Sequence, residues 1–373
     1  MSNPYHYGTP VSGDQFAGRE QETAGLVARM RDGINVVVIS PRRYGKTSLL
    51  ARAAERMRAD GAAVVEINAL RCRDLAAFAA QLANHTYRLK GGRWHRVRQA
   101  VPEFLRRLRV SPSVTFEGDQ PRFSFSSTLS TEDAETVIAD VYALLEELSE
   151  RKPAVLVLDE FQAITTLGAH LPSLFKALAD ANPHVSLVLE GSKRHLMERL
   201  VVSADAPLFG MAERFALDVL PDDVMTAYLR ARADVGGKPM SQAAADRLVE
   251  LAGPVPNDVQ QLAYEVFNVA ERRITVDDVE QGLLMAVEHE ATLHADRFES
   301  LAPGQRRVLS ELARSPAREP YSASFARDVA LATAGSVRTA LDALIADELV
   351  SFRGGTYRVG NPFFAAWLRE SLS

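Results

Sequence analysis

The stretch of sequence that decides the fold is VVVISPRRYGKTSLL, residues 36–50. Its four leading apolar residues predict a strand buried on both faces, and the run after Gly45 predicts the start of a helix. The loop between them matches the phosphate-binding pattern GxxxxGK[ST] except at its first position, where Ser40 replaces glycine. The stretch therefore predicts an α/β domain with a parallel sheet that binds the phosphates of a nucleotide.

Each residue type in this loop has an expected role. Gly45 lets the backbone approach the phosphates, Lys46 neutralises the β- and γ-phosphates, and the Thr47 hydroxyl binds Mg²⁺. Because Pro41 favours extended backbone at the residue before it, Ser40 does not need the positive φ that glycine would supply. We expect the nucleotide contacts to come from Ser40, Pro41, Arg42, Arg43, Tyr44, Gly45, Lys46, Thr47 and Ser48.

A second apolar strand, residues 154–158, ends in the two carboxylates Asp159 and Glu160. Ligands of open parallel sheets bind beyond the carboxyl ends of the strands, so this pair is expected beside the phosphate loop. There Asp159 would hold Mg²⁺ and Glu160 would act as the general base for an attacking water. The alternative is that the acidic pair only caps the following helix.

A third strand, residues 185–189, leads into Glu190, Gly191 and Ser192. Ser192 is the candidate for contacting the γ-phosphate or the attacking water, the alternative being a plain turn at the end of the strand. Further on, Arg194, Arg199 and Arg214 are candidates for an arginine finger, although surface arginines of helices are the common alternative.

The pattern of apolar residues divides the chain into three parts. Residues 1–215 alternate strands and helices as a phosphate-loop core, with a fourth predicted strand at 63–67 and a polar–apolar hairpin or loop inserted at about 111–131. Residues 216–295 show only helical spacing and predict a helical lid. Residues 296–373 show helix signals and then two short strands around Gly354 and Gly355, which predicts a winged helix.

Composition excludes several classes of protein. The 373 residues are 47% hydrophobic and carry a net charge of −5, as in an ordinary water-soluble globular chain. The one cysteine, Cys72, excludes a disulfide framework and a cysteine-ligated zinc site. No apolar run approaches the length of a membrane helix, and no apolar signal core opens the chain. We therefore expect a cytoplasmic protein without a membrane partner.

One segment departs from the acidic balance of the chain. Residues 71–109 hold ten Lys or Arg against two acids, with Tyr87 and Trp94 between them. Basic patches with aromatic residues can bind nucleic acid, whereas a solvated helix face or a docking surface for an acidic protein are the alternatives.

The predicted winged helix lacks the features of a strong DNA reader. Its expected recognition helix, about residues 334–348, has Arg338 as its one cation against Asp342, Asp347 and Glu348. Such a charge repels a duplex, and the module is expected to contact protein.

Three motifs in order resemble one family. FAGRE at residues 16–20 with Glu22, the loop at 41–50, and LDEFQ at 158–162 look like the archaeal-type ATPases on the AAA+/STAND side of the phosphate-loop ATPases, as does the end of the chain, YRVGNPFFAAWL at 357–368. The resemblance implies an ATPase core, a lid and a winged helix, with Gly18 and Arg19 near the adenine and Pro254 in the lid near the nucleotide. Members often have threonine where this chain has Glu190.

Together these features predict an ATPase that uses ATP and Mg²⁺ as a nucleotide-dependent switch or assembly motor for a partner. We expect a homo-oligomer in which an arginine of a neighbouring subunit completes the site, and a protein partner such as the product of an adjacent gene. The alternatives are an ATP-regulated initiator or regulator that binds nucleic acid through residues 71–109, and a scaffold that binds nucleotide without hydrolysing it.

Overall fold

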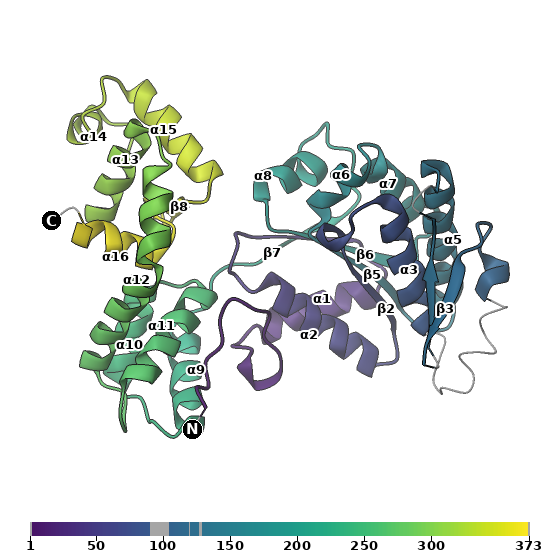
Figure 1. The fold of residues 1–373 in the computed structure, drawn as a ribbon, viewed down its shortest axis with the longest axis horizontal. Coiled ribbons are helices and arrows are strands. Elements are labelled where there is room, and N and C mark those ends of the chain that lie inside the picture. The colour runs from purple at the N-terminus through teal and green to yellow at the C-terminus, as the bar shows by residue number, and fades with distance from the viewer. Residues whose placement is uncertain (1, 90–103, 119, 127–128, 372–373) are drawn as a thin grey trace. The chain divides into compact units, whose positions relative to one another are not determined.

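The structure is a computed structural model that describes residues 2–89, 104–118, 120–126 and 129–371. The chain divides into two compact units. One comprises Arg19–Asp218, and the other combines Met1–Gly18 with Val219–Ser373. Figure 1 shows the elements of both units.

The unit Arg19–Asp218 is built on a parallel five-stranded sheet with the order β2-β5-β6-β1-β7. Its strands are β1 (Val36–Ile39), β2 (Ala63–Asn68), β5 (Ala154–Asp159), β6 (Val185–Gly191) and β7 (Glu213–Ala216). The four predicted strands are all present, and β1, β2, β5 and β6 are nearly continuous buried runs because helices cover both faces. The predicted α/β fold class with a parallel sheet is confirmed.

Helices lie on both faces of this sheet (Figure 1). α1 (Glu20–Arg31) and α2 (Lys46–Ala59) cover one face, and α3 (Leu75–Leu89), α5 (Thr131–Ser149) and α7 (Leu171–Ala181) pack with the strands into one core on the other. Short helices complete the connections: Ala69–Arg71, Phe161–Ala163, α6 (Ile164–Leu167), α8 (Arg194–Met197) and the π-helix Glu198–Val202.

The inserted segment forms an antiparallel hairpin apart from the main sheet. Its strands are β3 (Ser113–Glu117) and β4 (Gln120–Ser124). The Asn84 side chain of α3 hydrogen-bonds both backbone groups of Phe123, and the Phe123 ring is buried against Tyr87 and Phe104. The hairpin is thereby fixed to α3.

The other unit begins with a helical part. It contains α9 (Asp222–Val235), α10 (Gln242–Ala252), α11 (Pro256–Val269) and the first half of α12 (Val276–Glu299). The N-terminal segment, with a short helix at Gly13–Gln15, packs here and not with the sheet, where the expected range 1–215 had placed it. The reason is Tyr5, whose fully buried ring lies in this helical core and whose hydroxyl donates to the Leu229 carbonyl at 2.7 Å.

The C-terminal part of this unit has the order of a winged helix. α13 (Pro303–Arg314), α14 (Ala323–Asp328) and α15 (Ala334–Ala346) precede the hairpin β8 (Val350–Arg353) and β9 (Thr356–Val359), and α16 (Pro362–Ser371) follows. The turn of the hairpin is Gly354-Gly355, with φ of 56° and 73°, values that favour glycine. Among the described helices, none is both long and apolar enough to cross a membrane.

Candidate nucleotide-binding site

The sheet brings the predicted motifs to one edge. β6 lies between β1 and β5, with Ile39 paired to Gly191 and Leu158 paired to Leu189. The phosphate loop, the turn after β6 and the acidic end of β5 therefore follow neighbouring parallel strands at their carboxyl ends, where open α/β sheets bind ligands. Asn68 at the end of β2 joins the same edge through its pairing with Asp159.

The loop after β1 has the backbone shape of an anion site. Arg43 and Gly45 are left-handed, with φ of 70° and 85°, and α2 begins directly after them at Lys46. A Cβ added at Gly45 would meet nothing within 4 Å, so the space above the helix start is open. Ser40 is buried and is not among the described residues with positive φ. The loop thus forms without glycine at this position, and its open cradle fits a phosphate chain.

Lys46 is held inside the loop. Its ammonium donates to the Ser40 carbonyl at 2.9 Å and the Pro41 carbonyl at 3.0 Å, and lies 3.5 Å from Oε1 of Glu190. Both side chains of this ion pair are buried. A buried ammonium beside the open cradle can exchange these acceptors for phosphate oxygens.

Glu190 is the unusual residue of the site. It is fully buried at the end of β6, and its Oε2 has no hydrogen-bond partner among the described residues. Burial raises the pKa of Glu190 to about 9, the neighbouring carboxylates of Asp159 and Glu160 act in the same direction, and the Lys46 ammonium opposes them. The folded protein therefore releases the Glu190 proton at a higher pH than the unfolded chain does.

Glu190→Gln is expected to stabilise the fold more at about pH 8 than at about pH 5. Between pH 4.5 and about 9 the folded state binds more protons than the unfolded state, so the wild-type protein loses stability as pH rises. Glutamine keeps an oxygen that can accept a hydrogen bond from Lys46, and its amide does not ionise in this pH range. Thermal unfolding should give a gain in the free energy of unfolding that is clearly larger at about pH 8 than at about pH 5. Glu55→Gln, an exposed site on α2, is the control; an equal gain at both pH values would contradict the prediction.

The oxygen ligands at this edge fit a magnesium ion that also binds phosphate. Asp159 accepts from Asn68 Nδ2 at 2.7 Å and from the Glu160 backbone N–H at 3.0 Å, so its carboxylate is fixed in place. The Thr47 hydroxyl lies exposed in the first turn of α2. Within the described residues, no group of three or more His, Cys, Asp or Glu could hold a metal alone. Mg²⁺ ordinarily binds with one or two protein ligands, water and phosphates, which suits Thr47 and Asp159.

Glu160 has a constrained backbone and a fixed side chain. Its φ of 52° and ψ of 42° are left-handed, a conformation that non-glycine residues adopt mostly where surrounding structure enforces it. Ser192 Oγ donates to Glu160 Oε2 at 2.8 Å, and Gln162 Nε2 donates to the same oxygen. Ser192 thus reaches the proposed base directly. The roles of Gln162 and Asn68 were missed from the sequence, although Gln162 stands within the LDEFQ motif.

The remaining predicted site residues lie in different surroundings. Arg19 is buried, and its guanidinium donates to Glu22 and to the backbone carbonyls of Asp218 and Tyr44, the last at 3.5 Å. It therefore ties the phosphate loop to the start of α1 and the end of this unit. Gly18 and Pro254 belong to the other unit. Arg194 is the first residue of α8, and Arg199 and Arg214 are exposed.

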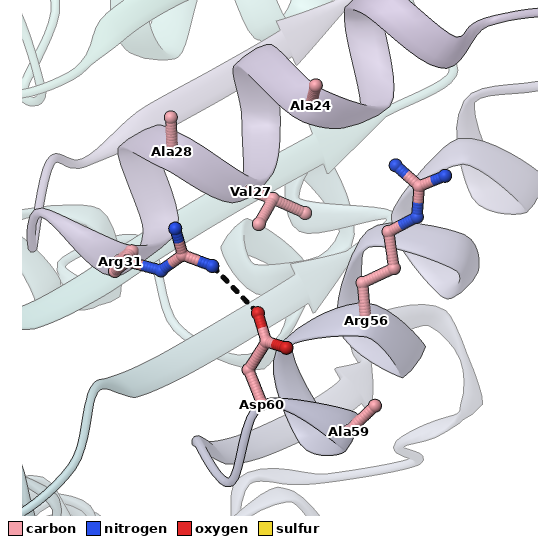
Figure 2. Close-up of a pocket in the computed structure, with 7 residues that line it drawn as sticks. All are labelled: Ala24, Val27, Ala28, Arg31, Arg56, Ala59 and Asp60. Carbon is pink, nitrogen blue, oxygen red and sulfur yellow. Dashed lines mark hydrogen bonds and ion pairs between the residues drawn. The ribbon is translucent and has the colours of Figure 1, made fainter.

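A separate pocket lies between the far ends of α1 and α2 (Figure 2). Its volume is about 360 Å³, and its lining residues are Ala24, Val27, Ala28, Arg31, Arg56, Ala59 and Asp60. Arg31 and Asp60 form an exposed ion pair of 2.7 Å across it. Because α2 starts at the phosphate loop and the pocket includes its last residues, this pocket is distinct from the candidate nucleotide site.

Comparisons with known proteins agree with this fold. The family described as "AAA ATPase domain" matches residues 15–189, and the family described as "Probable winged helix domain" matches residues 292–370. No curated protein matches the chain.

Among solved structures, the Walker-type ATPase of Pyrococcus abyssi has a TM-score of 0.61 at 19% identity, covering 95% of this chain and 97% of its own. The ORC2 protein of Aeropyrum pernix, as ADPNP and ADP complexes, has a TM-score of 0.58 at 14% sequence identity. This match covers 94% of the present chain and 93% of the ORC2 chain. The ORC1 protein of Aeropyrum pernix in complex with DNA has a TM-score of 0.50 at 15% sequence identity. This match covers 96% of the present chain and 94% of the ORC1 chain. At these identities the likeness describes the fold. Residues 15–189 thus match an AAA ATPase domain, and residues 292–370 match a winged helix domain that follows it in the chain.

Proposed function

We propose that this protein binds ATP with Mg²⁺ and hydrolyses it to ADP and phosphate. The observation that carries the proposal is the meeting of Lys46 and Glu160 at one sheet edge: a buried cation beside an open phosphate cradle, and a fixed carboxylate two strands away. The match to the AAA ATPase domain supports the same activity.

The residues of the site divide the reaction between them. The loop N–H groups and Lys46 bind the phosphates, and Thr47 and Asp159 would hold Mg²⁺, which neutralises charge on the β- and γ-phosphates. Glu160 accepts a proton from water as the water oxygen bonds to the γ-phosphorus. The bond from that phosphorus to the β–γ bridging oxygen breaks, and ADP leaves with its electrons.

The activity is proposed to serve as a nucleotide-dependent switch or assembly motor for a protein partner, such as one encoded by an adjacent gene. The two-unit organisation supports a switch, because Arg19 and Asp218 stand at the two places where the chain passes between the units, and Arg19 contacts both Asp218 and Tyr44 of the phosphate loop. A cytoplasmic location is part of this proposal.

The protein is expected to self-associate more in ATP than in ADP. Arg199 is exposed after β6 and Arg214 is exposed within β7. An arginine of a neighbouring copy could therefore complete the site, as arginine fingers do in trans. Sedimentation velocity at micromolar protein should show larger species with ATP and Mg²⁺. A monomer in both nucleotides would contradict the expectation.

A nucleic-acid regulator is the second candidate, because a structural neighbour is described in complex with DNA. Several described residues of the basic segment 71–109 weigh against it. Tyr87 is buried and cannot stack on a base, and carboxylates pair Arg73, Arg107 and Arg109. Arg93, Arg96, Arg98 and Trp94 lie outside the described residues.

The winged helix offers little to a duplex. In α15, Val337, Leu341 and Leu344 are buried in the core of the module, and Asp342 is exposed. The guanidinium of Arg338 lies 5.3 Å from the Tyr321 ring centre, in a cation–π contact. Ile345 is exposed.

Any DNA binding is therefore expected to depend on the basic segment, with low sequence preference and steep salt dependence. Replacing Arg93, Arg96 and Arg98 with Glu should abolish it. Replacing Arg338, Arg353 and Arg358 of the winged helix with Glu should leave it largely intact. Fluorescence anisotropy with labelled duplex DNA measures both variants, and the opposite pattern would overturn this assignment.

ATP turnover with and without duplex DNA separates the candidate functions. Turnover that does not need DNA supports the switch or motor, and turnover only with DNA supports the nucleic-acid regulator. Binding of ATP without any turnover, with or without DNA, would favour the non-hydrolysing scaffold and contradict the ATPase proposal.

A further inference from the structure

Two hydrogen bonds end on one oxygen of the Glu160 carboxylate. Gln162 Nε2 and Ser192 Oγ both donate to Oε2, the latter at 2.8 Å. Among the described residues, none donates a hydrogen bond to Oε1. Since an ionised carboxylate accepts on both oxygens, this arrangement orients the side chain through Oε2 and keeps Oε1 available for a proton.

The oxygen of the Gln162 amide has no hydrogen-bond donor among the described residues. Gln162 is only 6% exposed, and its Oε1 is buried without a hydrogen-bond partner among the described residues. A buried acceptor left unpaired costs about 1–3 kcal/mol. An apolar side chain of similar size would fill the same space without this cost, so packing does not account for a glutamine here.

The surroundings of Gln162 place the amide at the reacting edge of the sheet. A Cβ added at Gly191 would come within 2.4 Å of Gln162 Oε1, so this oxygen lies directly against the end of β6. A larger residue than glycine at position 191 would push the amide away. The unpaired oxygen points to a hydrogen-bond donor that arrives with the substrate.

We propose that Gln162 is a positioning residue for hydrolysis, which holds Glu160 through its amide nitrogen and orients the attacking water through its amide oxygen. The water then donates one hydrogen bond to Gln162 Oε1 and its other proton to Glu160 Oε1, while its oxygen bonds to the γ-phosphorus. This inference rests on the proposed ATPase function and names a further residue of that same site.

Gln162→Met tests the role while keeping the shape of the side chain. Methionine removes both the donor and the acceptor, so kcat is expected to fall about tenfold to a hundredfold. The affinity for a non-hydrolysable ATP analogue, measured by isothermal titration calorimetry, should stay within about twofold. The melting temperature should stay equal or rise, because the unpaired buried oxygen is gone. A residue that served only the fold would give the reverse: lower stability, with kcat unchanged in the folded fraction.

Gln162→Glu is the second variant, so that the conclusion on kcat does not depend on how well methionine is tolerated in the fold. It retains the acceptor but replaces the amide nitrogen with an oxygen that cannot bond an ionised Glu160, so kcat should fall at least as far as in Gln162→Met. Gln120→Ala, at an exposed position in the hairpin strand β4, is the matched control and should leave kcat unchanged.

The outcomes separate this inference from the proposed function. A wild-type chain that binds ATP without turnover contradicts the ATPase proposal and this inference with it. Wild-type turnover that persists in Gln162→Met and Gln162→Glu overturns the role of Gln162 alone. A loss of kcat matched by an equal loss of analogue affinity also overturns it, because it would assign Gln162 to binding.

Discussion

Lys46→Ala is expected to abolish tight ATP binding. The Lys46 ammonium is buried beside the open cradle, and it can transfer from two loop carbonyls to phosphate oxygens without leaving the site. Charge-assisted bonds to phosphate are about twice as strong as neutral ones. We expect the dissociation constant for ATP to rise roughly a hundredfold, which corresponds to about 2.7 kcal/mol. Isothermal titration calorimetry with ATP and Mg²⁺ measures this change.

The control for Lys46→Ala must separate lost binding from lost folding. Removing Lys46 leaves Glu190 buried without its cation, so some loss of stability is expected and melting temperatures must be compared. Lys152→Ala is the matched variant, since Lys152 precedes β5 and lies at the amino end of the strand, away from the site. A folded Lys46→Ala protein that binds ATP as tightly as wild type would contradict the role of the loop.

The core of the fold could be predicted because its signals are local. Residues 36–39, 63–67, 154–158 and 185–189 are apolar runs long enough to be recognised, and each became a strand of the sheet. β7 was missed since ERFA at residues 213–216 is short, half charged and mostly exposed. It is a strand because it pairs with β1, and this long-range pairing leaves no pattern in the local sequence.

The features that the sequence left hidden depend on distant contacts. Tyr5 joins the helical core through a hydrogen bond to Leu229, 224 residues away. The ion pair of Lys46 and Glu190 exists because β6 lies beside β1. Motifs in the sequence predicted the phosphate loop, Asp159 and Glu160 as site residues. The partners that fix Glu160 could not be predicted, because they are Ser192 in the turn after β6 and Gln162 two positions further along the chain.

Glu160→Gln is expected to keep ATP binding and lose turnover. Glutamine has the size of glutamate and can still accept a hydrogen bond from Ser192 through its amide oxygen, so the phosphate loop and Lys46 remain in place. An amide cannot take the proton of the attacking water, and loss of a general base lowers kcat by about 10²–10⁴-fold. Phosphate release gives kcat, and calorimetry with a non-hydrolysable analogue gives the affinity.

Comparing Glu160→Gln with Lys46→Ala separates the roles of the two charged residues: Lys46 in binding and Glu160 in turnover. Lys46 contributes to the bound ground state and to the transition state alike, so its loss acts on affinity, whereas Glu160 takes a proton only as water attacks. Affinity for the analogue should therefore stay within about twofold in Glu160→Gln while turnover is lost. Glu55→Gln, exposed in the middle of α2, should change neither quantity. Hydrolysis at the wild-type rate in Glu160→Gln would show that another group accepts the proton, and the assignment of the base would be wrong.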